Sequence, residues 1–294
     1  MKQRDLAVYA VLALVWGLSF VVVVRVVPAF GWAGAVSFRA LTAGVGLFAI
    51  ALLTRRRLDF SCGWRPLFAS GFLTVAMQLG GIAFAAPRIG TAMTAIIVAA
   101  IPLFSMVVGR IAGLERLSQR SMIGLLLGFA GIVMLVGFPD HAITSSFLFA
   151  CGVSIIGSLS AACGSLYAST RLRKVDPWVV AMGSFLSGGL LTMPLLFFVP
   201  VPTVPMPSDY LWLLVLGLVT SALMYVLFFG LLASIGPTRA ISVEFVVTVV
   251  AVSAGTLFLS ERLTPMQAAG AVVILTGCTL VLGLWPGGAR RRPA

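Results

Sequence analysis

Long apolar stretches alternate with short polar connections along the whole chain, and this pattern predicts helices that span a membrane. A spanning helix needs about 20 predominantly apolar residues. Ten stretches come close to this length, and the connections between them are too short to fold as separate soluble domains. The predicted spans are Asp5–Val27, Ala33–Thr54, Pro66–Phe84, Gly90–Gly109, Ser118–Gly137, Ser145–Thr170, Trp178–Val199, Asp209–Leu232, Thr238–Leu259 and Thr264–Leu284. The expected fold class is therefore an all-α polytopic membrane protein with ten transmembrane helices.

The second half of the chain repeats the first at a constant offset of 146 residues. Matching positions include Trp32 with Trp178, Arg25 with Arg171, and Glu115, Arg116 and Leu117 with Glu261, Arg262 and Leu263. Chance would match glycine and leucine in an apolar chain, but not tryptophan, arginine and glutamate at one offset. The pattern predicts a tandem duplication, with a first five-helix repeat over 1–140 and a second over 141–294 that ends in a short basic tail.

An odd number of spans in each copy reverses the second copy in the bilayer relative to the first. The ten helices are therefore expected to form two inverted five-helix repeats. This is the construction of many secondary transporters, in which the substrate site lies where the two repeats meet.

Composition agrees with a lipid environment, because 60% of the residues are hydrophobic, 10% are charged and the mean hydropathy is +1.12. A soluble core of this length could not bury so much apolar surface. The net charge of +12 does not indicate nucleic-acid binding, because the cations lie between spans, where cytoplasmic loops carry them. With the amino terminus inside, sixteen of the 20 Lys and Arg residues fall on the cytoplasmic side. We expect a multi-pass inner-membrane protein with both termini in the cytoplasm.

Motifs for catalysis are missing from the sequence. The four cysteines show no paired spacing, and no Walker loop, paired aspartate motif or histidine cluster occurs. We therefore expect no metal site, no cofactor and no enzymatic activity.

Two charges lie well inside predicted spans, and an intramembrane ionisable group is a functional hypothesis by default. Arg39 corresponds to Phe185 in the second copy, and Glu244 corresponds to Val98 in the first, so both charges break the duplication. Arg39 could instead extend to the outer headgroups. Glu244 has no cation three or four residues away, so its side chain must be hydrated, paired with another helix or protonated.

Further candidates are polar or aromatic groups near the middle of spans, among them Trp16, whose counterpart is Ala162. Core packing or hydrogen bonding between helices would explain several of them equally well. The predicted substrate-binding residues are Trp16, Ser19, Phe20, Arg39, Gln78, Thr94, Val98, Tyr167, Tyr225, Glu244 and Thr248. Within this set we expect apolar contact from Trp16 and Tyr225, and substrate orientation by Ser19 and Gln78.

Three features resemble EamA-type members of the drug/metabolite transporter superfamily. Residues 16–20 (Trp-Gly-Leu-Ser-Phe) are similar to the family's opening "WG-S-F", and Arg39 matches a common arginine early in span two. Pro102 followed by Glu115, with Glu261 in the second copy, is similar to a recurring proline-to-glutamate pattern. The resemblance implies ten helices in an inverted repeat around a central cavity, and export of small metabolites. The general pattern is closer to the amino-acid exporters, including those for aromatic amino acids, than to the nucleotide-sugar branch.

The function expected from the sequence is export of amino acids or related small metabolites by alternating access. Glu244 would bind an ammonium group or a proton, and Arg39 would bind a carboxylate or form an outer gate. The alternatives are an efflux carrier for drugs or other small organic solutes, or a membrane-embedded enzyme or channel. The expected partners are the small-molecule substrate and membrane lipid, with no nucleic acid. A monomer and a homodimer that packs through Gly124 and Gly128 both remain open.

Overall fold

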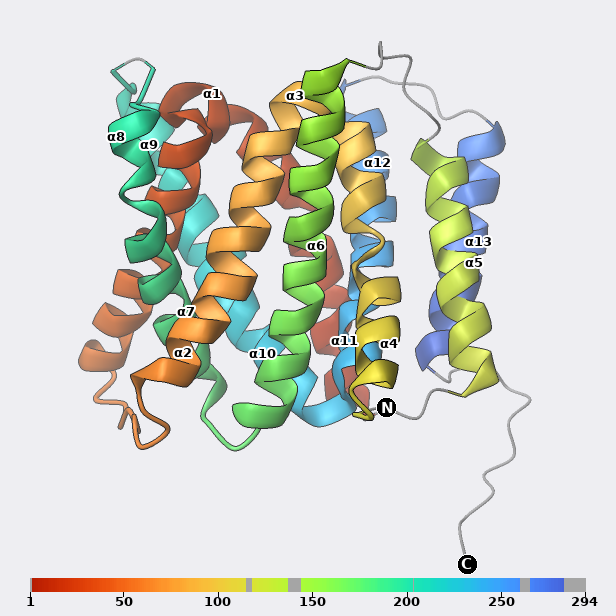
Figure 1. Cartoon of the computed structure of the whole chain (residues 1–294), viewed down its shortest axis with the longest axis horizontal. Coiled ribbons are helices and arrows are strands. Elements are labelled where there is room, and N and C mark those ends of the chain that lie inside the picture. The colour runs from red at the N-terminus through yellow and green to blue at the C-terminus, as the bar shows by residue number, and fades with distance from the viewer. Residues whose placement is uncertain (1, 115–117, 137–143, 203, 260–264, 283–294) are drawn as a thin grey trace, which may run out of the picture.

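The computed structural model describes residues 2–114, 118–136, 144–202, 204–259 and 265–282, and within these ranges all regular secondary structure is helical. The helices lie side by side and run between two faces of the molecule (Figure 1). The first two predicted spans form one long element, α1 (Gln3–Leu53), in which Gly31 departs from helical geometry with φ 70° and ψ 166°. Glycine adopts positive φ without a steric penalty, so the chain reverses direction there. Two limbs of α1 result, one on each side of Gly31.

The remaining elements cover the predicted spans, although α3 runs through the connection expected between the third and fourth spans and the seventh span is divided in two. In the first half they are α2 (Trp64–Gly71), η1 (Phe72–Met77), α3 (Gln78–Val98), α4 (Ile101–Ile111) and α5 (Gln119–Val136). In the second half they are α6 (Ser145–Arg171), α7 (Pro177–Thr192), α8 (Leu195–Phe198), α9 (Pro207–Leu214), η2 (Val215–Leu223), α10 (Met224–Ile235), α11 (Pro237–Ile241), α12 (Val243–Leu259) and α13 (Pro265–Leu282).

Five helical stretches of the described chain have the length and hydropathy needed to cross a bilayer. They are Arg25–Leu53, Trp64–Ile89, Ser145–Arg171, Pro177–Phe198 and Pro207–Ile235. Three further apolar helices, Ile101–Ile111, Gln119–Met134 and Ala268–Leu282, are shorter. The predicted all-α class of membrane protein is therefore confirmed.

Two π-helical segments, η1 and η2, lie in equivalent places of the two copies. Adding 146 to the bounds of η1 gives 218–223, which falls entirely within η2. A π-helical turn is closed by hydrogen bonds between residues five apart, so it is wider than an α-helical turn and changes the direction of the side chains that follow. Such turns occur often at functional sites.

The fourth predicted span is broken near Pro102. The helix α3 ends at Val98, and α4 begins at Ile101 with Pro102 in its first turn. Proline is tolerated there because its missing N–H would have no partner at a helix start.

The ninth predicted span is also broken, although a continuous helix was expected over Thr238–Leu259. α11 ends at Ile241 and α12 begins at Val243; Ser242 between them keeps αR backbone angles (φ −59°, ψ −11°) and donates its hydroxyl to Arg239 O at 2.8 Å. Consequently Glu244, expected in the body of a helix, lies in the first turn of α12.

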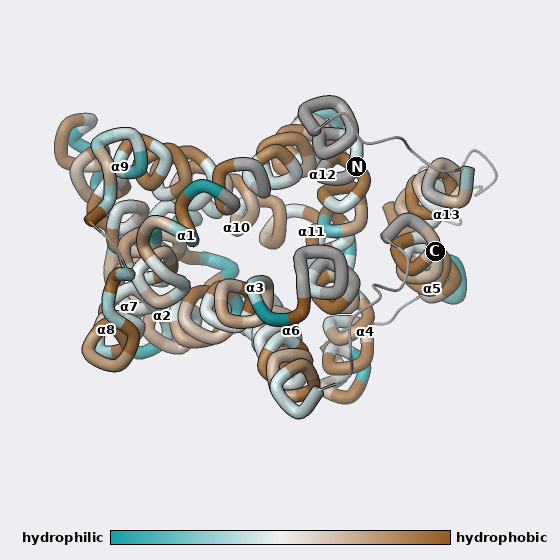
Figure 2. Tube along the Cα trace, turned by 90° about the horizontal axis from the view of Figure 1, so that it is seen from above, coloured by the Kyte–Doolittle hydropathy of each residue, from teal (hydrophilic) through white to brown (hydrophobic). Residues whose placement is uncertain are grey.

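Helices α5 and α13 form a pair at one end of the molecule (Figures 1 and 2). A Cβ atom added to Gly277 would lie 2.5 Å from Gly124 O and 2.7 Å from Gly128 N, so the two backbones are in direct contact. Glycines permit this close approach between membrane helices. Gly124 and Gly128 therefore pack α5 against α13 within one chain.

Candidate functional site

A cavity of about 350 Å³ lies among α1, α3, η2, α10 and α12. It therefore draws its wall from both copies and falls within the size range of small-molecule sites. Most of the wall is apolar: Val23, Val27, Pro28, Ala35, Val36, Leu79, Ile82, Ala83, Ala86, Pro87, Val98, Leu216 and Val247. The polar and large aromatic members are Trp16, Ser19, Arg39, Gln78, Thr94, Tyr225 and Glu244.

Eight of the eleven residues predicted to bind substrate contribute to this wall: Trp16, Ser19, Arg39, Gln78, Thr94, Val98, Tyr225 and Glu244. Tyr167 lies on α6, which adds no residue to the wall. Thr248 lies one turn after Glu244, outside the wall, and donates its hydroxyl to Glu244 O at 3.0 Å. The side chain of Phe20 lies outside the described part of the structure.

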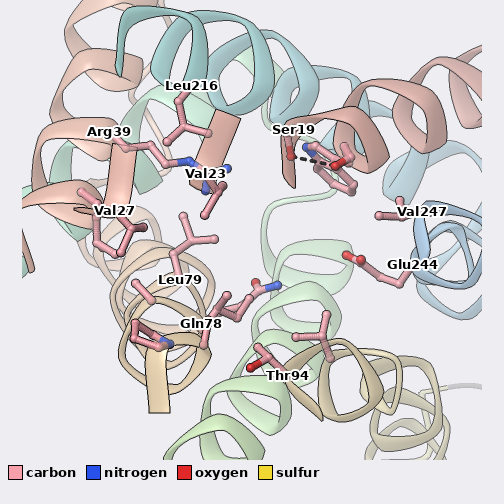
Figure 3. Close-up of a pocket in the computed structure, with 18 of the residues that line it drawn as sticks. Ser19, Val23, Val27, Arg39, Gln78, Leu79, Thr94, Leu216, Glu244 and Val247 are labelled. Atoms are coloured by element: carbon pink, nitrogen blue, oxygen red, sulfur yellow. Dashed lines mark hydrogen bonds between the residues drawn. The ribbon is translucent and has the colours of Figure 1, made fainter. Parts of the chain in front are cut away.

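Arg39 enters the cavity from the second limb of α1 (Figure 3). Its Nε donates a hydrogen bond of 2.5 Å to Ser221 Oγ. Among the described residues the ion pair is that of Arg56 with Asp176, at the surface, so no described carboxylate neutralises Arg39. The cavity thus contains a guanidinium whose terminal nitrogens are available to a ligand.

Glu244 enters the cavity from the opposite side, and the amide of Gln78 lies between the two charged groups (Figure 3). The amino-terminal end of a helix favours negative charge, so the break at Ser242 creates a suitable position for a carboxylate. Within the described structure no hydrogen bond or ion pair engages the Glu244 side chain. A buried charge without a partner is costly, so the cavity must provide water or a cationic ligand.

Trp16 belongs to an aromatic cluster at one end of the cavity. Its ring lies 5.4 Å from both Tyr225 and Phe228 between centroids, and its indole Nε1 donates to Thr220 O at 2.9 Å. Ser19 uses its hydroxyl proton within α1, on Trp16 O at 2.7 Å. Because the indole N–H is already hydrogen-bonded, Trp16 presents only the fixed apolar surface of its ring to the cavity.

Packed side chains close the cavity on the side where α1 begins. Leu12 is fully buried there, and the Tyr9 hydroxyl lies 3.1 Å from Ser242 Oγ, which joins α1 to the break between α11 and α12. In the other direction the wall extends to Pro28 and Pro87, near the reversal at Gly31. The cavity therefore extends from the packed start of α1 toward the reversal at Gly31.

Sequence reasoning did not select Ser221, which holds Arg39, or Thr220, whose carbonyl accepts the indole proton. A signal for Ser221 was present, because the equivalent residue of the first copy is Val75. Ser221 and Arg39, which contact each other, therefore both have apolar counterparts in the repeat, Val75 and Phe185.

A bundle of apolar helices around a cavity with two opposed charges defines a membrane transporter for small molecules. The chain belongs to the EamA-like transporter family, whose model matches residues 6–137 and again residues 148–283. The predicted resemblance and the predicted absence of enzymatic activity are both confirmed by this membership. Membrane lipid and a small-molecule substrate are the corresponding partners.

Several proteins are similar to the chain over nearly its whole length. The protein PecM of Dickeya dadantii is 27% identical over 291 residues, covering 96% of this chain and 92% of PecM. YedA of Escherichia coli K12, described as an uncharacterized inner membrane transporter, is 28% identical, covering 92% of this chain and 88% of YedA. A probable amino-acid metabolite efflux pump of Salmonella typhimurium is 25% identical, covering 94% of each chain.

The fold also resembles a protein of known crystal structure, with a TM-score of 0.80 and 16% sequence identity. The similarity covers 97% of this chain and 99% of the other. At this level of identity the likeness establishes the architecture.

Proposed function

We propose that this transporter exports amino acids or closely related small metabolites across the inner membrane by alternating access. One observation carries the proposal: Arg39 and Glu244 enter the same cavity from opposite sides, and neither has a counterion among the described residues (Figure 3). A zwitterion with a carboxylate at one end and an ammonium group at the other complements both charges. A neutral or singly charged substrate would leave at least one of them uncompensated in an apolar wall.

The other polar groups suit the same substrate class. The amide of Gln78 contains both donors and an acceptor, so it can bind either end of a zwitterion as the substrate moves. Val23, Leu79, Leu216 and Val247 would contact an apolar side chain. The Salmonella relative, named as an amino-acid metabolite efflux pump, supports this class of substrate.

We further propose that the chain crosses the membrane ten times, as inverted repeats over 1–140 and 141–294. The two matches to the family model and the equivalent positions of η1 and η2 support two copies of one unit. The reversal at Gly31 supports two crossings within α1.

We place both termini in the cytoplasm. α1 begins and α13 ends at the same face, and the basic connections at 55–57 and 171–174 lie at this face as well (Figure 1). Cytoplasmic loops carry an excess of Lys and Arg. In this orientation the end of the cavity near Gly31 faces the outside, and the buried residues Tyr9 and Leu12 lie on the cytoplasmic side.

Counterflow in proteoliposomes tests the transport function. The purified protein is reconstituted with a high internal concentration of an unlabelled L-amino acid, and uptake of the labelled compound is followed over a panel. Saturable, transient accumulation of amino acids is expected, with lower exchange of their amides and decarboxylated amines. Exchange of hydrophobic organic cations without exchange of any amino acid would support the drug-efflux alternative and contradict the proposal.

A further inference from the structure

We infer that Ser221 is a specificity-determining residue that positions the guanidinium of Arg39 as a receptor for the carboxylate of the substrate. The inference deepens the proposed function, since it takes the cavity as the substrate site. The class of ligand is an organic carboxylate, and the residue acts through Arg39 rather than by touching the substrate.

The hydrogen bonds of Ser221 fix both its own position and that of Arg39. A serine hydroxyl has one proton and two lone pairs. Ser221 Oγ donates its proton to Leu216 O at 2.8 Å, so its remaining capacity is that of an acceptor, and it accepts the N–H of Arg39 Nε at 2.5 Å. Ser221 thus binds Arg39 through the one nitrogen that does not belong to the terminal fork.

The terminal fork of Arg39 is left free for a ligand. Its two terminal nitrogens make no hydrogen bond to any described residue, while Nε is held by Ser221. A guanidinium fork matches the two oxygens of a carboxylate, and such paired hydrogen bonds are among the strongest in proteins. Fixing Nε orients the plane of the guanidinium before the ligand arrives, which reduces the entropy lost on binding.

The π-helical segment η2 brings Ser221 to this place. Gly217, near its start, lets η2 approach the second limb of α1 closely, since an added Cβ would lie 2.6 Å from Thr42 Cγ2. The bond from Ser221 to Leu216 spans five residues, the spacing of a π turn. The adjacent carbonyl, that of Thr220, holds Trp16. One π segment therefore positions both Trp16 and Arg39.

The symmetry-related pair of positions shows that the fold does not need a polar pair here. Gly71, the counterpart of Gly217 and the last residue of α2, brings the start of η1 close to α7 in the same way. The counterparts of Arg39 and Ser221 are Phe185 and Val75, and both are completely buried. Because both residues are apolar and buried at the symmetry-related pair of positions, helix packing does not require the polar pair Arg39–Ser221, and ligand binding explains it.

The test compares two variants of nearly identical shape, Ser221→Val and Ser221→Thr, which differ in the hydroxyl. Valine is the residue that the first copy carries at the equivalent position. Binding to the purified full-length protein is measured by titration calorimetry with four probes of one carbon skeleton: L-leucine, L-leucinamide, 4-methylpentanoate and 3-methylbutylamine. L-leucine and 4-methylpentanoate carry a carboxylate, and L-leucinamide and 3-methylbutylamine do not.

We expect Ser221→Val to raise the Kd of leucine and of 4-methylpentanoate about tenfold, the loss expected for one hydrogen bond to a charged group. The Kd of the two probes without a carboxylate should stay within about twofold, and Ser221→Thr should restore the wild-type values. Ser154→Ala, which removes a buried hydroxyl without a hydrogen-bond partner in the described structure, is the matched control and should change none of the four. If valine prevents folding, Ser221→Ala carries the same expectation.

Three results would overturn the inference: an equal loss for all four probes, no loss for the carboxylates, or a wild-type protein that binds the amine but neither carboxylate. The proposed amino-acid function fails separately. If 4-methylpentanoate binds as tightly as leucine and depends on Ser221, the carboxylate subsite stands while the requirement for an ammonium group does not.

Discussion

Replacing Glu244 with glutamine removes a charge from the cavity and keeps the shape of the side chain. An ammonium group bound to the carboxylate would lose a hydrogen bond between charged partners, which contributes about 1.5–3 kcal/mol. Since none of the described residues offers a second carboxylate in the cavity wall, nothing replaces this loss. We therefore expect Glu244→Gln to raise the Kd of L-leucine and 3-methylbutylamine by roughly 10- to 150-fold.

The folded protein itself should tolerate this substitution. No described residue forms a hydrogen bond or ion pair with the Glu244 side chain, and a neutral amide is less costly to bury than a carboxylate. The free energy of unfolding should therefore be unchanged or slightly higher. Asp209→Asn, the same change in an acid outside the cavity, is the control and should leave the binding of all four probes unchanged.

The assay combines calorimetry with counterflow in liposomes at several pH values. If Glu244 instead carries a coupling proton, Glu244→Gln should still bind and exchange substrate but lose its response to an imposed pH gradient. The same Kd for the amine, the same exchange rate and the same pH dependence as wild type would refute both roles. Glu244 would then be a structural residue of the α12 start.

Three further predictions concern topology, the aromatic cluster and helix packing. In a background without native cysteines, a cysteine at Pro205 should react with an impermeant maleimide from outside intact cells, and one at Arg56 should not; labelling of Arg56 would contradict the proposed orientation. Trp16→Phe should lower the free energy of unfolding by about 1 kcal/mol through the lost indole bond, and Trp16→Ala by about 3–5 kcal/mol. Both Trp16 variants should reduce counterflow per folded molecule. Normal counterflow by Trp16→Ala would show that Trp16 stabilises the fold and does not take part in transport. Gly277→Val should destabilise the protein by about 1–3 kcal/mol in equilibrium unfolding, because its side chain meets the backbone of α5. Gly152→Ala, which meets nothing within 4 Å, should be neutral or stabilising by contrast.

The predictable part of the fold is the part that depends on local sequence. Hydropathy places the helices because lipid requires long apolar stretches, and Pro102 marks a break because proline acts on its own helix. The interruption at Ser242 was not predicted, since serine is tolerated in membrane helices; the hydroxyl of Tyr9, 233 residues away, contacts Ser242 at this point. Tertiary contacts of this kind leave no periodic pattern in the sequence.

The same division applies to the candidate site. Arg39 and Glu244 stand out because charges are rare inside membranes, and the repeat shows that each occurs in one copy. Helical periodicity does not select Ser221, because a π turn shifts the face that the following residues present; the mismatch with Val75 in the repeat is the signal that would have found it. Tyr167 was selected for its residue type and its place near the middle of a span, and its helix does not contribute to the cavity wall.

The matched π segments also suggest an order in which features of this protein arose during evolution. A wide turn present at the same place in both copies fits a feature that the half-length unit carried before its gene was duplicated. Trp16, Arg39 and Glu244 each occur in one copy, so they were acquired or kept after fusion. On the proposed topology the ancestor would have been a pair of identical chains inserted in opposite orientations, whose pore had two equal walls. Joining the two chains allowed the two walls of the cavity to diverge. Only then could the cavity distinguish the carboxylate end of a substrate from its ammonium end.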